Sequence, residues 1–224
     1  MTSANIPNSL TSISDTTFYN CSSLQNIIIP NNIISIGASA FSGCTKLTVA
    51  TMSDNITTIG NYAFSNCSSL GNISLPNTLS SIGTYAFRGC SSLSSITIPD
   101  SITSLPNYVF YNCTGLTNVT LSNNLASIGT YAFGSCSKIT TLTIPDSVTS
   151  INTNAFRSCS AMTKVILSNN ISSIGNYAFY NCSNLSEITY QDTTYTSLAE
   201  LKSVLTANSA TYSTNTFSNT GLAA

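Results

Sequence analysis

Eight cysteines are the side chains best suited to chemistry, and they share one spacing. They stand at a constant interval along the chain, as Cys21, Cys44, Cys67, Cys90, Cys113, Cys136, Cys159 and Cys182. Such a column could form a thiol ladder, disulfides between neighbours or a metal site. Stacked side chains point the same way, which suits a disulfide poorly, and zinc needs four converging ligands, typically at CxxC spacing. We therefore expect reduced, buried thiols and no metal site.

The composition excludes several classes of protein. The chain has 224 residues, of which 42% are apolar and 6% charged, with a net charge of -1 and no histidine. A nucleic-acid binder needs a basic face, which six Lys and Arg residues spread along the chain do not make. Without histidine, Ser-His-Asp and Cys-His catalysis are excluded. We expect a non-enzymatic protein with no catalytic residues and no cofactor.

The chain also lacks the usual signals for membranes. Its first residues, MTSANIPNSL, lack the basic and apolar regions of a secretory signal peptide. No apolar run approaches the ~18 residues of a membrane span. We expect no membrane insertion.

A 23-residue period organises almost the whole chain, which is typical of a solenoid. Within one repeat, Ile96 and Ile98 alternate with polar residues, which predicts a short strand. A second arc follows over residues 102–105, and the Tyr-Ala-Phe segment predicts a tight helical or 3₁₀ turn. The repeated phenylalanines precede each cysteine by three residues: Phe18, Phe41, Phe64, Phe87, Phe110, Phe133, Phe156 and Phe179.

A second, 46-residue period is superimposed on the first. Asp54, Asp100, Asp146 and Asp192 recur at this interval, and the alternate repeats carry Asn there. This pattern indicates duplication of a two-repeat unit. Because Asp favours turns, we expect the acidic column to cap turns.

The repeat closely resembles the BspA-like (treponemal-type) leucine-rich repeat. The resemblance lies in IxxIGxxAFxxCxxLxxIxIP, written here from Ile82–Gly83 through Ala86–Phe87 and Cys90 to Pro99, and it extends over eight 23-residue repeats in residues 7–190. It implies a β-rich solenoid with a parallel sheet on the concave face and short extended or 3₁₀ turns on the convex face. It also implies a cell-surface or extracellular location, a part in adhesion and no catalytic residues.

The two ends depart from the repeat. We expect an N-terminal half-coil cap over residues 1–17, the solenoid over 18–190 and a C-terminal cap over 191–224. In the last segment, Leu198, Leu201, Val204 and Leu205 predict a short helix over about 197–206 with Ser197 as its N-cap. Residues 211–222 read as a partial repeat, with Phe217 in the Phe position and Thr220 in the Cys position.

Polar side chains should line the outward face of the predicted sheet, because Ile96, Ile98, Val119, Leu121, Leu142 and Ile144 should point inward. Such a face could bind a partner, or it could simply be a solvated strand surface, which β-branched Thr also suits. The candidate partner-binding residues are Asn72, Ser95, Thr97, Asn118, Thr120, Thr141 and Thr143.

A column of tyrosines offers an alternative surface. It is interrupted by Ser39 and Asn154, and it could serve an interface or merely cover the coil turns as a stacked ladder. Its members are Tyr62, Tyr85, Tyr108, Tyr131 and Tyr177.

These features predict a protein-interaction or adhesion module that binds a protein or glycan through the concave sheet. The alternative is a structural subunit of a virion, fibre or filament that associates through the solenoid ends. A binder should be monomeric, whereas an assembly subunit should self-associate end to end.

Overall fold

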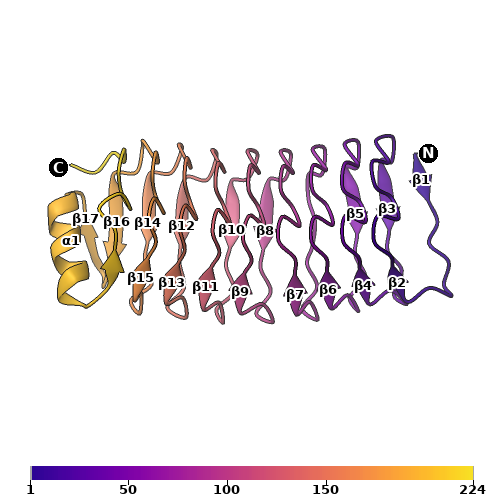
Figure 1. Cartoon of the computed structure of the whole chain (residues 1–224), viewed down its shortest axis with the longest axis horizontal. Coiled ribbons are helices and arrows are strands. Elements are labelled where there is room, and N and C mark those ends of the chain that lie inside the picture. The colour runs from indigo at the N-terminus through magenta and orange to yellow at the C-terminus, as the bar shows by residue number, and fades with distance from the viewer. Residues whose placement is uncertain (1, 224) are drawn as a thin grey trace.

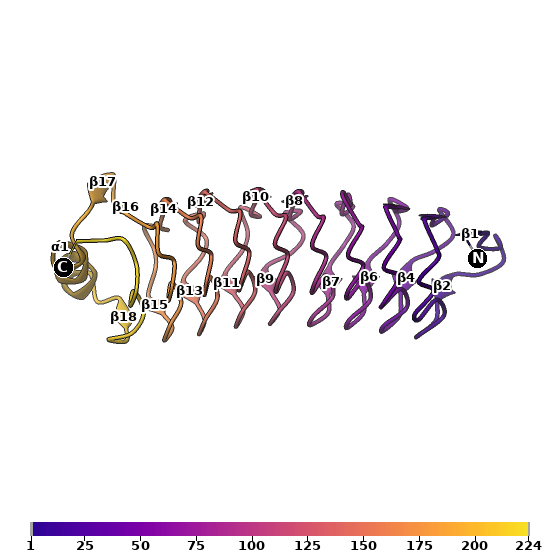
Figure 2. The ribbon, with the colours of Figure 1, turned by 90° about the horizontal axis from the view of Figure 1, so that it is seen from above.

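The chain folds as a single row of coils, one for each repeat. The computed structural model describes residues 2–223, so Met1 and Ala224, the outer limits of the two expected caps, lie outside the described residues. The N-terminal coil lies at one end of the stack and helix α1 (Leu198–Ala207) at the other (Figure 1). Turned by 90°, the coils still follow one another in one row (Figure 2). The expected parallel-strand solenoid is confirmed.

The first sheet takes one strand from each repeat, just after its Leu. The strands that the repeats contribute are parallel and in register, so that Thr120 lies opposite Thr97. The sheet is divided into three hydrogen-bonded pieces, and an isolated bridge from Asn72 to Val49 extends the first. The pieces are β1 (Ser3–Ala4), β3 (Asn26–Ile28) and β5 (Val49–Thr51); β8 (Ser95–Thr97) and β10 (Asn118–Thr120); and β12 (Thr141–Thr143), β14 (Lys164–Ile166), β16 (Glu187–Tyr190) and β17 (Thr193–Tyr195).

The second sheet comes from the arc that follows the Pro or Asn turn of each coil. It has two pieces, both parallel. The first contains β2 (Ser12–Ile13), β4 (Ser35–Ile36), β6 (Thr58–Ile59) and β7 (Ser81–Ile82). The second contains β9 (Ser104–Leu105), β11 (Ser127–Ile128), β13 (Ser150–Ile151), β15 (Ser173–Ile174) and β18 (Thr211–Tyr212).

Pro106 lies at the break between β7 and β9. Most other coils have Gly at this place, and the amide of Gly83 donates to the carbonyl of Ile59 at 2.7 Å. One later coil has Asn152 there, whose amide still donates to Ile128 at 2.9 Å, and its ladder is intact. Proline has no such hydrogen to offer Ile82. Pro106 therefore cannot form the hydrogen bond between coils that Gly83 and Asn152 form at this place.

The core is a set of columns that run along the stack. Neighbouring Phe rings from Phe18 to Phe179 lie parallel, with centroids 5.1–5.6 Å apart. This separation follows from the strand spacing of about 4.8 Å. Ile102 and Leu105 are buried, as expected for the second arc, whereas Val119 in β10 is only half-buried against the core.

The arc from the Tyr column to the Cys column is a run of turns. Residues 2–223 contain no 3₁₀ helix. Tyr62 and Asn66 both have a φ of 58°, in the left-handed region. Between coils, alternate amides of the arc donate to carbonyls of the following coil, as Phe64 does to Ala86 at 2.8 Å and Asn66 to Arg88 at 2.6 Å. These bonds all run in the same direction along the stack.

The 46-residue period has a structural use. Asp100 Oδ1 accepts a hydrogen bond from the Asn123 amide at 2.8 Å, and Asp146 Oδ1 accepts one from the Asn169 amide at 2.8 Å. The expected turn capping is thus confirmed for these two residues, and it acts across coils. A second set of side-chain oxygens, which also recurs in alternate coils, accepts hydrogen bonds from backbone amides of the next coil. The pairs are Asp15 with Ala38, Asn61 with Thr84 and Asn107 with Thr130.

The cysteine column belongs to the core. All eight thiols are free, and seven are buried. The expectation that all eight are buried is wrong for Cys21, which is partly exposed because the coil before it contributes no thiol. Each later thiol donates to the Phe carbonyl of the preceding coil at 3.1–3.2 Å, as Cys90 does to Phe64.

Burial keeps these thiols neutral. It raises the pKa of Cys44 from near 9 to about 11 and the pKa of Cys113 to about 12. Burial is also the main cause that raises the pKa of Cys67 and Cys90, and neighbouring thiols add to it. A neutral, buried thiol is a poor nucleophile and a poor metal ligand.

The N-terminal coil is more complete than the sequence predicted. Ser3 and Ala4 form β1 and pair in parallel with β3, although no Cys-Leu segment precedes them. Ile6 and Ile13 are buried, whereas Leu10 is exposed.

After Tyr190 the chain turns back on itself. Gln191 and Asp192 have φ values of 49° and 58°, which is typical of a two-residue type I′ hairpin turn. Strand β17 consequently pairs antiparallel with β16 and covers the last edge of the first sheet. The repeat pattern gave no expectation of this hairpin.

The last segment then returns to the stack. Helix α1 lies within one residue of the predicted range and buries Leu201 and Leu205, although the hydroxyl of Ser197 makes no cap hydrogen bond. Strand β18 pairs with β15, and the Phe217 ring stacks on Phe179 at 5.5 Å, as the partial repeat predicted. Thr220 differs from the cysteines, because its hydroxyl donates to Phe217 of its own coil.

Removal of residues 191–224 should destabilise the chain. The truncation would uncover the Phe179 ring and the β15 and β16 edges, and bare strand edges promote aggregation. We expect a lower melting temperature and concentration-dependent light scattering. Phe217→Ala in the full chain is the milder control, since it removes only one ring. A truncated chain as stable and soluble as the parent would contradict the expected capping.

Alkaline pH should unfold the protein through its thiols. In the unfolded chain, Cys44 and Cys113 ionise near pH 9, whereas burial in the folded chain raises the pKa of their thiols to about 11 and about 12. Their contribution to stability is therefore complete below pH 9 and is lost as the pH rises toward 11–12. Each thiol should reduce the free energy of unfolding by ~1.4 kcal/mol per pH unit in that window.

Urea unfolding at pH 7, 9 and 10.5 measures this loss. Because Tyr and Lys also titrate there, Cys113→Ala serves as the matched comparison. The free energy of unfolding of this variant should fall less steeply above pH 9 than that of the parent, because the variant lacks the contribution of one thiol. Parallel pH profiles for parent and variant would contradict the assignment.

Candidate binding surface

The predicted partner-binding residues all lie on the outward side of the first sheet. We call them the strand face, namely Asn72, Ser95, Thr97, Asn118, Thr120, Thr141 and Thr143; all seven are exposed. Their position follows from the period of two in each strand, since Ile96 and Leu142 point into the core.

The structure groups these residues unevenly. Ser95 lies opposite Asn118, and Thr97 opposite Thr120, in the paired strands β8 and β10. Thr141 and Thr143 instead pair with the following coil, in β14. No ladder joins β10 to β12 in the described chain, so the strand face is divided there.

Two neighbouring columns of hydroxyls behave differently. One column precedes the strands and serves the stack: Thr48, Thr117 and Thr163 each donate to a carbonyl of the previous coil at 3.0–3.2 Å. The hydroxyls of the strand face form no hydrogen bond with any other residue among 2–223, and of its two amides only that of Asn72 accepts one, from Ser94. The sequence did not distinguish these two columns. Both are rich in Ser and Thr, and only the register separates them.

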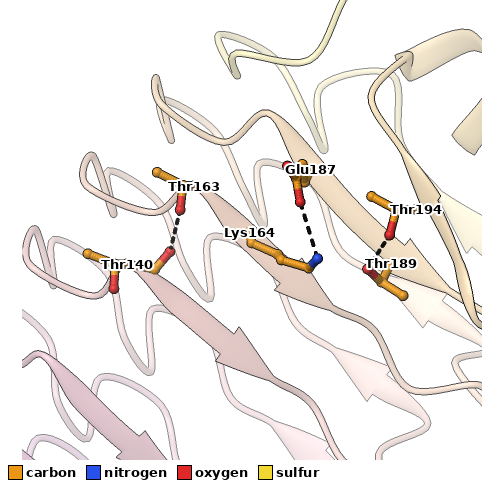
Figure 3. A network of polar contacts seen from close by, with 6 residues as sticks. All are labelled: Thr140, Thr163, Lys164, Glu187, Thr189 and Thr194. Carbon is orange, nitrogen blue, oxygen red and sulfur yellow. Dashed lines mark hydrogen bonds and ion pairs between the residues drawn. The ribbon is translucent and has the colours of Figure 1, made fainter.

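The C-terminal end of the first sheet is more charged. Lys164 Nζ lies 3.2 Å from Glu187 Oε2 across β14 and β16, and both side chains are partly exposed (Figure 3). The Thr189 and Thr194 hydroxyls lie 2.9 Å apart where β17 closes the edge. An exposed pair of this kind contributes ~0–1 kcal/mol, so its main effect here is to leave the face neutral.

Four of the five predicted ladder tyrosines stack on one another. Tyr62, Tyr85, Tyr108 and Tyr131 follow at centroid separations of 4.7, 4.5 and 4.9 Å, with interplanar angles of 4°, 11° and 13°. Burial, together with these neighbours, raises the pKa of Tyr108. Tyr177 lies outside the stack, because Asn154 interrupts it.

Tyr177 belongs to a second aromatic cluster that the sequence did not reveal. Its ring meets Tyr180 edge-on at 5.2 Å, and the Arg157 guanidinium lies 4.7 Å from the Tyr180 centroid. Arg157 also donates to Asn154 Oδ1 at 3.3 Å. The fixed offset of three residues between these tyrosines was the only sequence signal.

The described residues offer no site for a metal. No group of three or more Cys, Asp or Glu side chains converges within residues 2–223. The one helix of that range is too short to cross a bilayer.

Solved structures support the fold. A leucine-rich repeat protein from Bacteroides ovatus is 29% identical, with a TM-score of 0.76 over 80% of this chain and 49% of its own. The chain thus spans about half the length of that protein. One from Eubacterium ventriosum is 22% identical, with a TM-score of 0.58 over 85% of this chain and 60% of its own. The pneumococcal vaccine antigen PcpA is 24% identical, with a TM-score of 0.51 over 81% and 54%.

The family itself is recognised from the sequence. No curated protein matches the chain significantly. The model of the BspA-type leucine-rich repeat region matches in six copies over residues 1–117 and 80–202, most of the chain. The chain therefore belongs to the BspA-type leucine-rich repeat family.

Proposed function

We propose that the chain is a non-enzymatic interaction module that binds a protein or glycan partner through the strand face. The observation that carries this proposal is the row of exposed hydroxyls and amides that the stack itself hardly uses. The adjacent column of Thr hydroxyls is consumed by bonds between coils. The strand face is therefore a polar surface that the stack leaves available to a partner.

The rigidity of the sheet favours binding there. Thr97 and Thr120 are β-branched residues in paired strands; Thr97 lies between buried Ile96 and Ile98, and Thr120 between half-buried Val119 and buried Leu121. Such side chains lose little freedom on binding, so the entropy that opposes association is small.

The electrostatics of the face define the kind of contact. Its seven residues carry no charge, and the nearest ion pair is self-compensating. We expect recognition by hydrogen bonds and shape, with a weak dependence on salt. Membership of a leucine-rich repeat family, in which sheet surfaces commonly serve binding, supports the same function.

A charged face should abolish binding. The variant Thr97→Lys, Thr120→Lys, Thr143→Lys places three ammonium groups on the strand face, and its melting temperature should match the parent because all three positions are exposed. Laminin, collagen and mucin are immobilised as probes, and surface plasmon resonance measures binding at low and high salt. We expect the variant to lose binding to each probe that the parent binds.

The matched control carries the same charge in the same coils. Thr103→Lys, Ala126→Lys, Thr149→Lys alters three exposed residues that precede the second sheet. It should bind as the parent does. Equal loss in both triple variants would indicate a general charge effect and reject the strand face. Light scattering that shows polymers growing with concentration would instead favour assembly through the solenoid ends.

A further inference from the structure

We propose that the tyrosine stack and Arg88 form a second binding site, for an acidic sugar unit that carries a carboxylate or a sulfate. The site is a hollow of about 390 Å³, which we call the tyrosine groove. Its lining consists of Tyr62, Tyr85, Arg88, Tyr108, Tyr111 and Tyr131. The groove lies on the turn arcs, so it does not depend on the strand face.

The tyrosines occupy backbone positions that do not favour them. Tyr62, Tyr85, Tyr108 and Tyr131 have φ between 53° and 60°, which is unfavourable for a bulky side chain. Coils with Ser39 or Asn154 at this position adopt the same left-handed conformation. The fold therefore does not require Tyr here, and strained residues of this kind concentrate at functional sites.

The groove has a built wall. The Tyr111 ring stands edge-on to Tyr108 and Tyr131, at 5.7 and 5.6 Å. Gly134 allows this placement, because a Cβ there would lie 2.8 Å from Tyr131 Cδ1 and 3.1 Å from Tyr111 Cδ2. The next arc thus leaves out a side chain where the Tyr111 ring needs the space.

Arg88 is the charged group of the groove and is free to bind. It is exposed, and it makes no ion pair, side-chain hydrogen bond or ring contact within residues 2–223. Arg157, at the corresponding position of a later coil, is occupied by Tyr180 and Asn154. The comparison identifies Arg88 as the guanidinium available to a ligand.

The chemistry of the lining selects the ligand. Because the tyrosine rings stack, most of their faces are covered, and the groove presents ring edges, phenol hydroxyls and a guanidinium. The ring edges are the positive part of the aromatic quadrupole. No carboxylate lines it. A donor-rich, electropositive groove favours an anion that is rich in acceptors, such as a carboxylate or a sulfate.

The exposed ring of Tyr62 favours a sugar as the body of the ligand. Tyr62 ends the stack, because the preceding coil has Ser39, and it is 38% exposed. Tyr62 and Arg88 line the same hollow, so a sugar can contact the exposed part of the Tyr62 ring there while its acidic group binds Arg88 and its hydroxyls meet the phenols. The volume lies within the range of sites for small ligands.

Titration of the full chain with defined probes tests the site. The chain has no Trp, so its emission comes from tyrosine, and five of its eleven tyrosines line the groove. Trigalacturonate supplies carboxylates, a heparin hexasaccharide supplies sulfates, and maltotriose is the neutral sugar. Hexaglutamate and sodium sulfate present the anion without a sugar. We expect binding of one or both acidic sugars and at least tenfold weaker binding of the other three probes.

Two arginine variants provide the sharpest comparison. Arg88→Gln should weaken acidic-sugar binding at least tenfold with an unchanged melting temperature, since the side chain is exposed. Arg157→Gln removes the same charge from the same column and should stay within twofold of the parent. Tyr62→Ser, which copies the adjacent coil, should also weaken binding.

Several results would overturn the proposal. They are no binding by either acidic sugar, equal binding of maltotriose or hexaglutamate, or equal losses in the two arginine variants. None of them bears on the strand face. The triple-lysine variant of the strand face should bind acidic sugars at least as well as the parent, so the two sites can fail independently.

Discussion

The carbonyl group of the repeated phenylalanine is the acceptor on which the stack depends. In Phe64 it accepts the Cys67 amide of its own coil at 3.2 Å and the Cys90 thiol of the next coil at 3.2 Å. Both lone pairs are thereby used, one within a coil and one between coils. A cysteine that shifted by one residue would leave a buried carbonyl short of a partner. This satisfaction of buried groups accounts for a spacing that stays constant through eight repeats.

The same requirement explains the alternation of coils. Where strands do not supply a partner, side chains such as Asp100 and Asn107 reach amides of the following coil. Each link needs an acceptor in one coil and a free amide in the next. Duplication of a two-coil unit copies the acceptor and the amide together. The 46-residue period in the sequence is therefore consistent with the need to keep each acceptor paired with its donor.

Much of the fold could be predicted from the sequence because its signals are periodic. The alternation around Ile96 and the column of Phe and Cys define the strands, the core and the thiol ladder. Local exceptions could not be predicted in this way. The break in the second sheet lies at Pro106, a single departure from the repeat, and the hairpin at Gln191 depends on two left-handed residues that carry no Gly or Asn-Gly signal. The surface followed the pattern less closely still. The period places Thr97 outward and Tyr85 in a ladder. Only the structure distinguishes hydroxyls that form hydrogen bonds between coils from those that form none, and only the structure shows that the Arg88 side chain has no partner among the described residues.

The directional bonds of the turn arcs make the two ends of the rod chemically unlike. Successive peptide groups of a strand alternate in direction, so a strand offers donors and acceptors to both of its neighbours. Along the arcs, by contrast, the amides of Phe64, Phe87 and Phe110 all point toward the following coil. An arc therefore ends in carbonyl oxygens on its N-terminal side and in N–H groups on its C-terminal side. Two rods whose arcs met would place donors against acceptors only head to tail, and any other orientation would oppose like groups.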